Sequence, residues 1–135
     1  MPIEDKMVYE EDIIPTIFKD RRVKRLTTPE RENSQKVSIH MFTVSAPCTS
    51  DEVCDSDHDI GWYVIEGEGE MIYDGEIHPF IPGTAVYIPK GCKYHLIATT
   101  NLKIYEVSKP PVRRSDWANR KDLVMLEPED AVIKK

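Results

Sequence analysis

Residues 61–95 decide the fold, and they read GWYVIEGEGEMIYDGEIHPFIPGTAVYIPKGCKYH. Asp74-Gly75 favours a tight primed hairpin turn, because both positions tolerate positive φ. Prolines and glycines end the later runs of this stretch. Short strands punctuated this regularly predict an antiparallel barrel or sandwich. The strand-like runs of this stretch cover residues 62–65, 70–73, 77–81 and 85–88.

The segments before and after this stretch extend the β pattern. The apolar run at residues 13–18 contains a proline, which suits an edge strand better than a central one. Residues 102–107 (LKIYEV) predict a last strand. Residues 37–44 (VSIHMFTV) alternate, so that one face of the predicted strand carries Ser38, His40, Phe42 and Val44.

The segments between the predicted strands are polar. Residues 19–25 (KDRRVKR) are interpreted as a solvated basic segment, residues 27–35 as a polar loop, and residues 46–59 as a loop rich in possible ligands. Ser115 would cap a helix that extends to residue 126.

Length and composition indicate one domain, residues 1–135, with its core at roughly residues 37–108. The formal net charge of −6 argues against nucleic acids and anionic membrane surfaces as partners. No apolar run is long enough to span a bilayer, and the acidic N-terminus lacks the apolar centre of a secretory signal, so a cytoplasmic location is expected. Three cysteines, an odd number, favour reduced thiols over a disulfide framework.

Two motifs resemble those of the cupin family: YVIEGEGEMIYDGE at residues 63–76 and PGTAVYIPKG at residues 82–91. The resemblance covers roughly residues 37–108. It implies an all-β, cupin-like jelly-roll β-barrel, here with a short C-terminal extension. It says little about activity, because this fold hosts many unrelated functions.

Cupins usually bind a divalent metal through two His and one Glu of the first motif and one His of the second. Counting in strict register replaces all four ligands in this chain, and His95 stands one residue beyond the last position. The four positions fall on Cys54, Ser56, Ile60 and Tyr94, or on Val53 and Asp55 for the first two with the other spacing that the family allows.

A second similarity is to the ectoine synthases, a branch of the cupins. They carry a Tyr and a His eight residues apart that are implicated in metal binding, and Tyr87 and His95 have the same spacing. The metal-binding Glu of that branch again corresponds to Ile60, so its activity is not carried over.

A metal site built from displaced ligands is one alternative. Cys54, His58 and His95 would offer thiolate and imidazole donors with one open position, which suits Zn²⁺ or Fe²⁺. Such an ion should be bound weakly and removed by a mild chelator. The competing interpretation has no metal, with nearby aspartates capping a solvated turn and His58 facing water.

Without a metal, the mouth of the barrel would be an apolar cup with a few polar groups, as a small-ligand site requires. His95 would then serve in acid–base chemistry, and Tyr87 would donate its hydroxyl. The ligand-binding candidates are Ser56, Trp62 and Tyr94.

The direction of His95 depends on the turn before it, because a shift of one residue moves a side chain to the other face of a strand. If the extra residue is absorbed in the turn at residues 89–94, His95 points into the barrel; if it is absorbed later, Tyr94 does. We expect the first arrangement.

The sequence thus predicts a cupin barrel that binds a small polar or anionic metabolite. It would be an enzyme of the isomerase or lyase type with an atypical or absent metal site. The alternatives are a non-catalytic binding or accessory cupin, and a metal-dependent enzyme using Cys54, His58 and His95. A homodimer is expected, since the proline-interrupted N-terminal segment and the strand edges need cover.

Overall fold

The computed structural model describes residues 7–118 and 125–127. Most of these residues form short antiparallel strands, and the expectation of at least seven strands is confirmed. The strands are β1 (Thr16–Phe18), β2 (Arg22–Thr27), β3 (Ser38–Val44), β4 (Cys48–Thr49), β5 (Val53–Cys54), β6 (Asp59–Glu66), β7 (Gly69–Tyr73), β8 (Glu76–Phe80), β9 (Ala85–Ile88), β10 (Lys93–Ala98), β11 (Leu102–Lys109) and β12 (Met125–Glu127). The helices are α1 (Pro29–Glu32), α2 (Arg114–Ala118) and a 3-10 turn at Glu10–Asp12.

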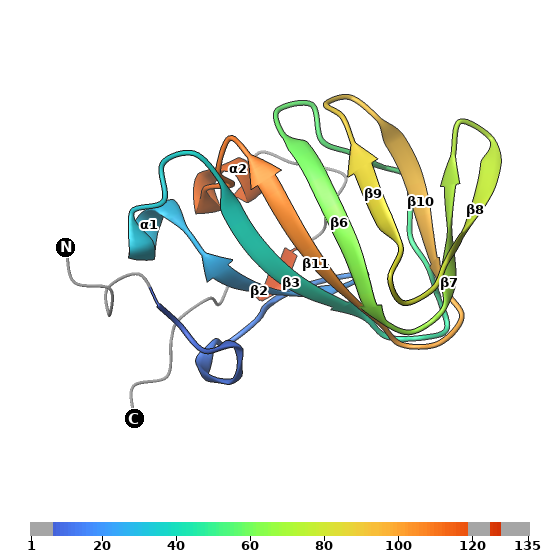
Figure 1. The fold of residues 1–135 in the computed structure, drawn as a ribbon, viewed down its shortest axis with the longest axis horizontal. Coiled ribbons are helices and arrows are strands. Elements are labelled where there is room, and N and C mark those ends of the chain that lie inside the picture. Colours follow the sequence, from blue (N-terminus) through green and yellow to red (C-terminus); the bar gives the residue numbers. More distant parts are fainter. Residues whose placement is uncertain (1–6, 119–124, 128–135) are drawn as a thin grey trace.

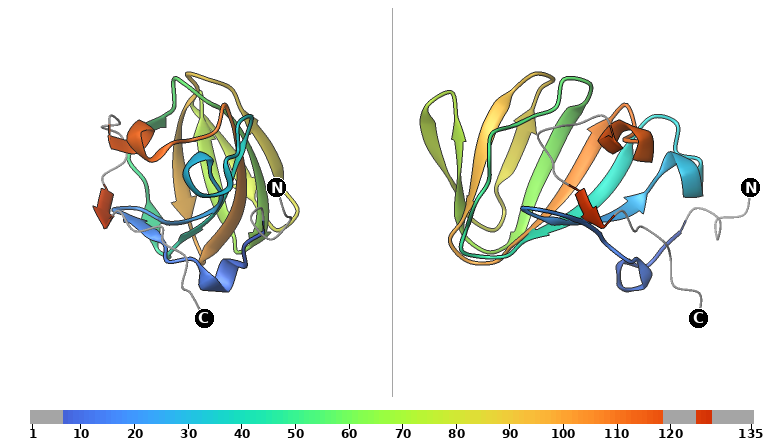
Figure 2. Two further views of the ribbon diagram at one scale, coloured as in Figure 1. Left: turned by 90° about the vertical axis from the view of Figure 1, so that its left-hand side faces the viewer. Right: turned by 180° about the vertical axis from the view of Figure 1, so that it is seen from behind.

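The strands form two sheets that enclose one interior, which is the jelly-roll β-barrel expected from the sequence (Figures 1 and 2). The larger sheet has the order β12-β1-β2-β3-β11-β6-β9, and the smaller one has the order β4-β10-β7-β8, with β5 also paired to β10. Both short α-helices lie at the same end of the barrel (Figure 1). No helix within the described residues is long and apolar enough to cross a membrane.

The core follows from the alternation of the strands. Ser38, His40, Phe42 and Val44 are all buried, which confirms the face predicted for residues 37–44. Trp62 lies at the centre of the aromatic packing, where its ring stands edge-on to neighbouring rings at centroid distances of 5.2, 6.0 and 5.1 Å. Burying a side chain of this kind contributes about 1.5–3 kcal/mol. The three partner rings belong to Phe42, Phe80 and Tyr94.

Two glycine positions show why the central stretch folds as it does. Asp74 and Gly75 connect β7 to β8 with φ values of +53° and +76°, which confirms the predicted primed hairpin turn. At Gly69, a Cβ atom would lie 2.1 Å from the carbonyl oxygen of Ile97. Only glycine therefore allows β7 to approach β10 this closely.

The N-terminal third departs from the sequence-based expectations. The basic run at residues 19–25 is not a solvated segment, because β2 begins at Arg22 and both Arg21 and Arg25 are buried. Strand β1 is not an edge strand, because it pairs with β2 on one side and with β12 on the other.

Helix α1 interrupts the polar loop expected at residues 27–35. Thr28 caps this helix by accepting a hydrogen bond from the Arg31 amide at 3.0 Å, and the Glu32 carboxylate accepts one from the Thr28 amide at 2.9 Å. Such reciprocal capping, with proline in the first turn, makes a helix of four residues possible. The sequence Thr28-Pro29 followed by Glu32 could therefore have predicted the start of this helix.

The C-terminal segment also differs from the prediction. The helix expected from Ser115 to residue 126 is confined, within the described residues, to α2 at its start, and residues 125–127 form strand β12. The intervening residues 119–124 lie outside the described residues. Buried Phe18, Val23 and Val112 extend the core beyond the range 37–108.

Candidate functional site

A small cavity of about 30 Å³ lies inside the barrel. That volume holds one or two water-sized molecules. Charged and polar groups line it together with aliphatic side chains, which is unusual for a barrel core. The polar lining consists of Arg21, His40, Asp55, Tyr94 and Glu106, and the apolar lining consists of Phe18, Val23, Val53, Ile60 and Val112.

One row across the large sheet supplies much of the polarity. Arg25 on β2 stands opposite His40 on β3, which stands opposite Glu106 on β11, which in turn stands opposite Trp62 on β6. Because directly opposed residues of neighbouring strands share a face, all four side chains lie on the inner side. The register of the sheet therefore brings a guanidinium, an imidazole, a carboxylate and an indole N–H to one level of the barrel.

Glu106 is the centre of this row. Its Oε2 accepts a hydrogen bond from the Trp62 indole N–H at 3.2 Å, and its Oε1 accepts one from the Ser108 hydroxyl at 3.1 Å. The Nδ1 atom of His40 lies 3.6 Å from Oε1. Burial alone would raise the pKa of Glu106, but hydrogen bonding and charge from His40, with the charge of Arg21, outweigh burial and lower this pKa. Glu106 is therefore an ionised carboxylate within the barrel.

Arg21 enters the cavity from the turn between β1 and β2. Its guanidinium stacks 4.9 Å from the centre of the Phe42 ring and donates two hydrogen bonds to the Asp20 carboxylate, at 3.3 and 3.1 Å. Burial alone would lower the pKa of Arg21, but the Tyr94 hydroxyl and Asp20 outweigh it and raise this pKa. The cavity therefore contains a fixed positive charge on one side and the Glu106 carboxylate on another.

A buried pair formed by His58 and Asp55 lies at the cavity rim. His58 Nδ1 lies 2.9 Å from both carboxylate oxygens of Asp55, and its Nε2 lies 3.4 Å from Asp116 on α2. Burial alone would lower the pKa of His58, but the hydrogen bond and the charge of Asp55 outweigh it and raise this pKa. This arrangement differs from the expectation that His58 faces water.

The ligand-binding candidates from the sequence fall into two groups. Trp62 and Tyr94 lie together in the barrel interior, and Tyr94 lines the cavity. Ser56 is exposed on the loop before β6. Tyr87, a catalytic candidate, is 69% exposed on the outer face and donates a hydrogen bond to Asp59 at 3.3 Å. The structure therefore does not bring Tyr87 into the cavity.

The expectation that His95 points into the barrel is wrong. Tyr94 is 3% exposed and packs against Trp62, whereas the side chain of His95 is 39% exposed and lies 3.3 Å from the Ser50 carbonyl oxygen. The turn before β10 is closed tightly by a hydrogen bond from the Cys92 amide to the Pro89 carbonyl at 3.1 Å. The extra residue is therefore not absorbed there, and strand alternation turns Tyr94 inward and His95 outward.

The residues at the usual cupin ligand positions do not fit a metal ion. The Glu position is the buried aliphatic Ile60, and the last His position is Tyr94. The displaced set of Cys54, His58 and His95 is not brought together either, because His58 is engaged by aspartates while His95 is on the outer face. Within residues 7–118 and 125–127, no group of three or more His, Cys, Asp or Glu side chains could hold an ion.

Sequence reasoning missed Arg21, His40 and Glu106 as site residues. The alternation of residues 37–44 did place His40 on the face that proved to be internal, so that signal was available. Arg21 belonged to a basic run, and such runs are usually solvated. Glu106 could not be placed without knowing which residue of β11 stands opposite His40.

The comparisons with known proteins agree with this architecture. Residues 49–108 match the family described as Cupin domain. The chain is 36% identical over 67 residues to an L-ectoine synthase of Saccharophagus degradans, a region that covers 50% of this chain and 51% of that protein. It is 33% identical over 69 residues to an L-ectoine synthase of Hahella chejuensis, covering 50% and 52%. The aligned region thus spans about half the length of these curated relatives.

Solved structures show the same fold across most of the chain. Ectoine synthase from P. lautus superposes with a TM-score of 0.70 at 21% identity, covering 100% of this chain and 91% of that one. KdgF from Halomonas sp. gives 0.69 at 16% identity, with coverage of 82% and 98%. The polyketide cyclase RemF from Streptomyces resistomycificus gives 0.68 at 21% identity, with coverage of 80% and 83%. At these identities the likeness concerns the fold.

Proposed function

Because this chain belongs to the cupin superfamily, we propose that it is a small-molecule enzyme whose substrate lies in the barrel interior. The observation that carries this proposal is the ionised Glu106 beside His40 in the wall of the cavity. Burying charge costs free energy and is concentrated at functional sites. Structural neighbours that include enzymes, such as ectoine synthase and a polyketide cyclase, support the assignment at this general level.

The residues present suggest the substrate class. The guanidinium of Arg21 is held in place by Asp20 and offers a planar donor surface that suits a carboxylate or another oxyanion. The Tyr94 hydroxyl lies beside Arg21 in the same cavity. We therefore infer a small polar or anionic metabolite, bound by its oxyanion to Arg21 and Tyr94.

His40 is the acid–base candidate of this site. Its Nδ1 lies 3.6 Å from the Glu106 carboxylate, and this contact orients the ring in the wall of the cavity. Together with an oxyanion held by Arg21, proton transfer by His40 would support an isomerisation or elimination of the lyase type. No step is assigned to a metal, because the side chains at the usual ligand positions do not fit one.

A non-catalytic binding protein is the second candidate. The structural basis is the same cavity, since a bound metabolite would use Arg21 and Tyr94 whether or not proton transfer follows. The two candidates differ only at His40, which a binding protein would not need as a base. Turnover of a bound ligand by the wild type, abolished in His40→Gln while the ligand still binds, would favour the enzyme.

The proposal can be tested with a panel of small hydroxy, keto and amino carboxylates, assayed by thermal shift and calorimetry. We expect at least one to bind the wild type and to bind Tyr94→Phe and Arg21→Lys at least tenfold more weakly, since a charged hydrogen bond contributes about 1.5–3 kcal/mol. Tyr9→Phe is the matched control, because Tyr9 is exposed and lies outside both the cavity lining and the outer face of the large sheet. Equal weakening in the control, or binding that survives both interior substitutions, would place the ligand elsewhere.

We also propose a homodimer formed through the outer face of the large sheet. Tyr63, Tyr105 and Val107 are 51%, 40% and 44% exposed there, beside Tyr87. Three tyrosines at such exposures present roughly 300 Å² of surface, comparable to the largest patch of a typical monomer. Light scattering should show a dimer for the wild type and for Ile77→Lys, whose site is on the small sheet, but a monomer for Tyr63→Lys. A monomeric wild type would contradict the proposed homodimer.

A further inference from the structure

Residues 110–118 run across the end of the barrel directly after β11 (Figures 1 and 2). The last ladder pair of β11 joins Lys109 to Asp59, and two prolines follow, which have no N–H to continue the ladder. Val112 comes next, is 3% exposed and forms part of the cavity wall. The chain later returns to the large sheet as β12, so this segment is tethered at both ends.

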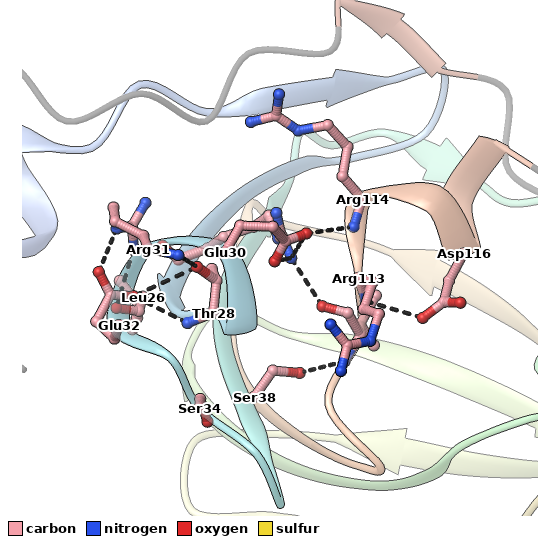
Figure 3. A network of polar contacts seen from close by, with 12 residues as sticks. Leu26, Thr28, Glu30, Arg31, Glu32, Ser34, Ser38, Arg113, Arg114 and Asp116 are labelled. Atoms are coloured by element: carbon pink, nitrogen blue, oxygen red, sulfur yellow. Dashed lines mark hydrogen bonds and ion pairs between the residues drawn. The ribbon is translucent and has the colours of Figure 1, made fainter.

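Side chains of the barrel hold this segment by its backbone (Figure 3). The Val112 amide donates to the Ser38 hydroxyl at 2.9 Å, and the Val112 carbonyl accepts from the Arg25 guanidinium at 2.7 Å. The Arg114 amide donates to Glu30 at 2.6 Å. Asp116, on the same segment, lies 3.4 Å from His58.

The other parts of the cavity wall are held differently. Most lining residues lie on strands with ladder hydrogen bonds. Of those outside strands, Arg21 accepts a backbone hydrogen bond from Phe18 at 2.8 Å, and Asp55 accepts one from Gly91 at 2.8 Å. Val112 instead relies on the side chains of Ser38 and Arg25. Displacing Val112 therefore leaves every described ladder intact.

We propose that residues 110–118 are a lid, and that the ligand of the interior site enters when this lid opens. The inference rests on the proposed function, since it concerns access to the same cavity. A cavity of about 30 Å³ is far smaller than the 300–1,000 Å³ of ordinary ligand sites, so a wall must move before a metabolite fits. Because side chains and not ladder hydrogen bonds hold Val112, we assign the opening of the wall to residues 110–118.

The docking surface for the lid exists before the lid closes. Arg25 is fully buried and donates to both carboxylate oxygens of Glu30 at 3.1 and 3.0 Å, so α1 would keep its direction when the Val112 carbonyl moves away. The Glu30 carboxylate then accepts from the lid amide of Arg114. Because the acceptors and donors stay in place, the open lid can close again without rearranging the barrel.

The test uses Asp116→Ala, which removes the His58 contact and the hydrogen bond that the Asp116 carboxylate accepts from the Arg113 amide at 2.8 Å, and compares it with Glu76→Ala. Glu76 forms a similar pair with His78 at 3.6 Å, but both side chains are exposed on β8, away from the lid. Ser38→Ala is the second lid variant, in case Asp116→Ala lowers stability globally. All variants are made in a Trp117→Phe background, so that Trp62 is the sole tryptophan.

Two measurements need no ligand. Hydrogen exchange should accelerate roughly tenfold or more at the amides of Arg114 and Asp116 in both lid variants, because each variant loses a contact of about 1–3 kcal/mol that holds the lid. Neither amide loses its own acceptor, which is the Glu30 carboxylate for Arg114 and the Arg113 carbonyl for Asp116. Acrylamide quenching of Trp62, which is 3% exposed and hydrogen-bonded to the cavity residue Glu106, should rise in parallel. The Glu76→Ala control should match the parent in both.

The outcomes distinguish a failure of the lid proposal from a failure of the proposed function. Unchanged exchange at the Arg114 and Asp116 amides, or faster exchange there with unchanged quenching of Trp62, overturns the lid. Equal effects in Glu76→Ala also overturn it, because they would reflect general destabilisation. Failure of every carboxylate to bind would refute the proposed function, while the exchange and quenching results would still decide whether the lid exists.

Discussion

Glu106→Gln is the substitution that probes the interior charge most directly. Glutamine keeps the shape of the side chain and an oxygen that can accept from the Trp62 indole N–H. It loses the negative charge that faces His40 at 3.6 Å and offsets Arg21. The substitution therefore separates the charge of this residue from its packing.

The expected cost is about 2 kcal/mol at neutral pH. Losing a hydrogen bond to an ionised acceptor costs about 1.5–3 kcal/mol, and the loss of attraction to Arg21 adds to this. The neutral glutamine does not carry the cost of burying a charged carboxylate, which offsets part of these two losses. For a chain of 135 residues, this corresponds to a fall in Tm of about 7 °C.

The pH dependence gives the sharper test. The pKa of Glu106 is lowered in the folded protein, so its ionised form stabilises the fold above the ordinary pKa of 4.5, and that contribution is lost as the pH falls through the folded value. Urea unfolding from pH 3.5 to 8 should show a constant gap between wild type and variant above about pH 5, closing below it. A gap under 0.5 kcal/mol, or one that widens on acidification, would refute an ionised Glu106. Glu66→Gln, exposed at the end of β6, is the control.

Three further predictions concern other parts of the molecule. The pKa of His58 is raised in the folded protein, so protonated His58 stabilises the fold below the ordinary pKa of 6.5, and this contribution is lost as the pH rises through the pKa of the folded state. Thermal melts over this pH range should show the wild type losing stability relative to His58→Gln. Gly69→Ala should cost about 2–3 kcal/mol in urea unfolding, because its Cβ would meet the strand opposite, whereas Gly61→Ala has nothing within 4 Å and should be tolerated. Dialysis against a mild chelator, or His95→Ala, should leave Tm and interior ligand binding unchanged within error; a loss of either would restore a metal or His95 to the site.

Strand alternation and turn dipeptides predicted the parts of the fold that depend on neighbouring residues in the sequence. The alternation of residues 37–44 placed His40 and Phe42 on the inner face, and Asp74-Gly75 predicted the hairpin that β7 and β8 form. These signals work because a strand alternates with period two and because few residues tolerate positive φ. They required no knowledge of the partner strands.

The buried arginines were beyond such rules. Arg25 is interior because it meets Glu30 nearby and the carbonyl of Val112, a residue 87 positions away in the sequence. A basic run gives no sign of partners at that distance. Arg21 similarly depends on Tyr94, which reaches it from the opposite sheet. The interpretation of residues 19–25 as solvated failed because it treated charge as a property of the segment alone.

The same reasoning explains where the polar groups of this barrel are. The two positions that cupins use for the Glu and the last His carry Ile60 and Tyr94 here. The ionisable groups are found instead on the adjoining strands β3 and β11, as His40 and Glu106. Both strands have ladder partners on each side, which fixes the distance between acid and base. Adaptation to a ligand then falls to the parts of the wall outside the strands. Of these, Val112 is the one that side chains hold, and we assign the adaptation to its segment.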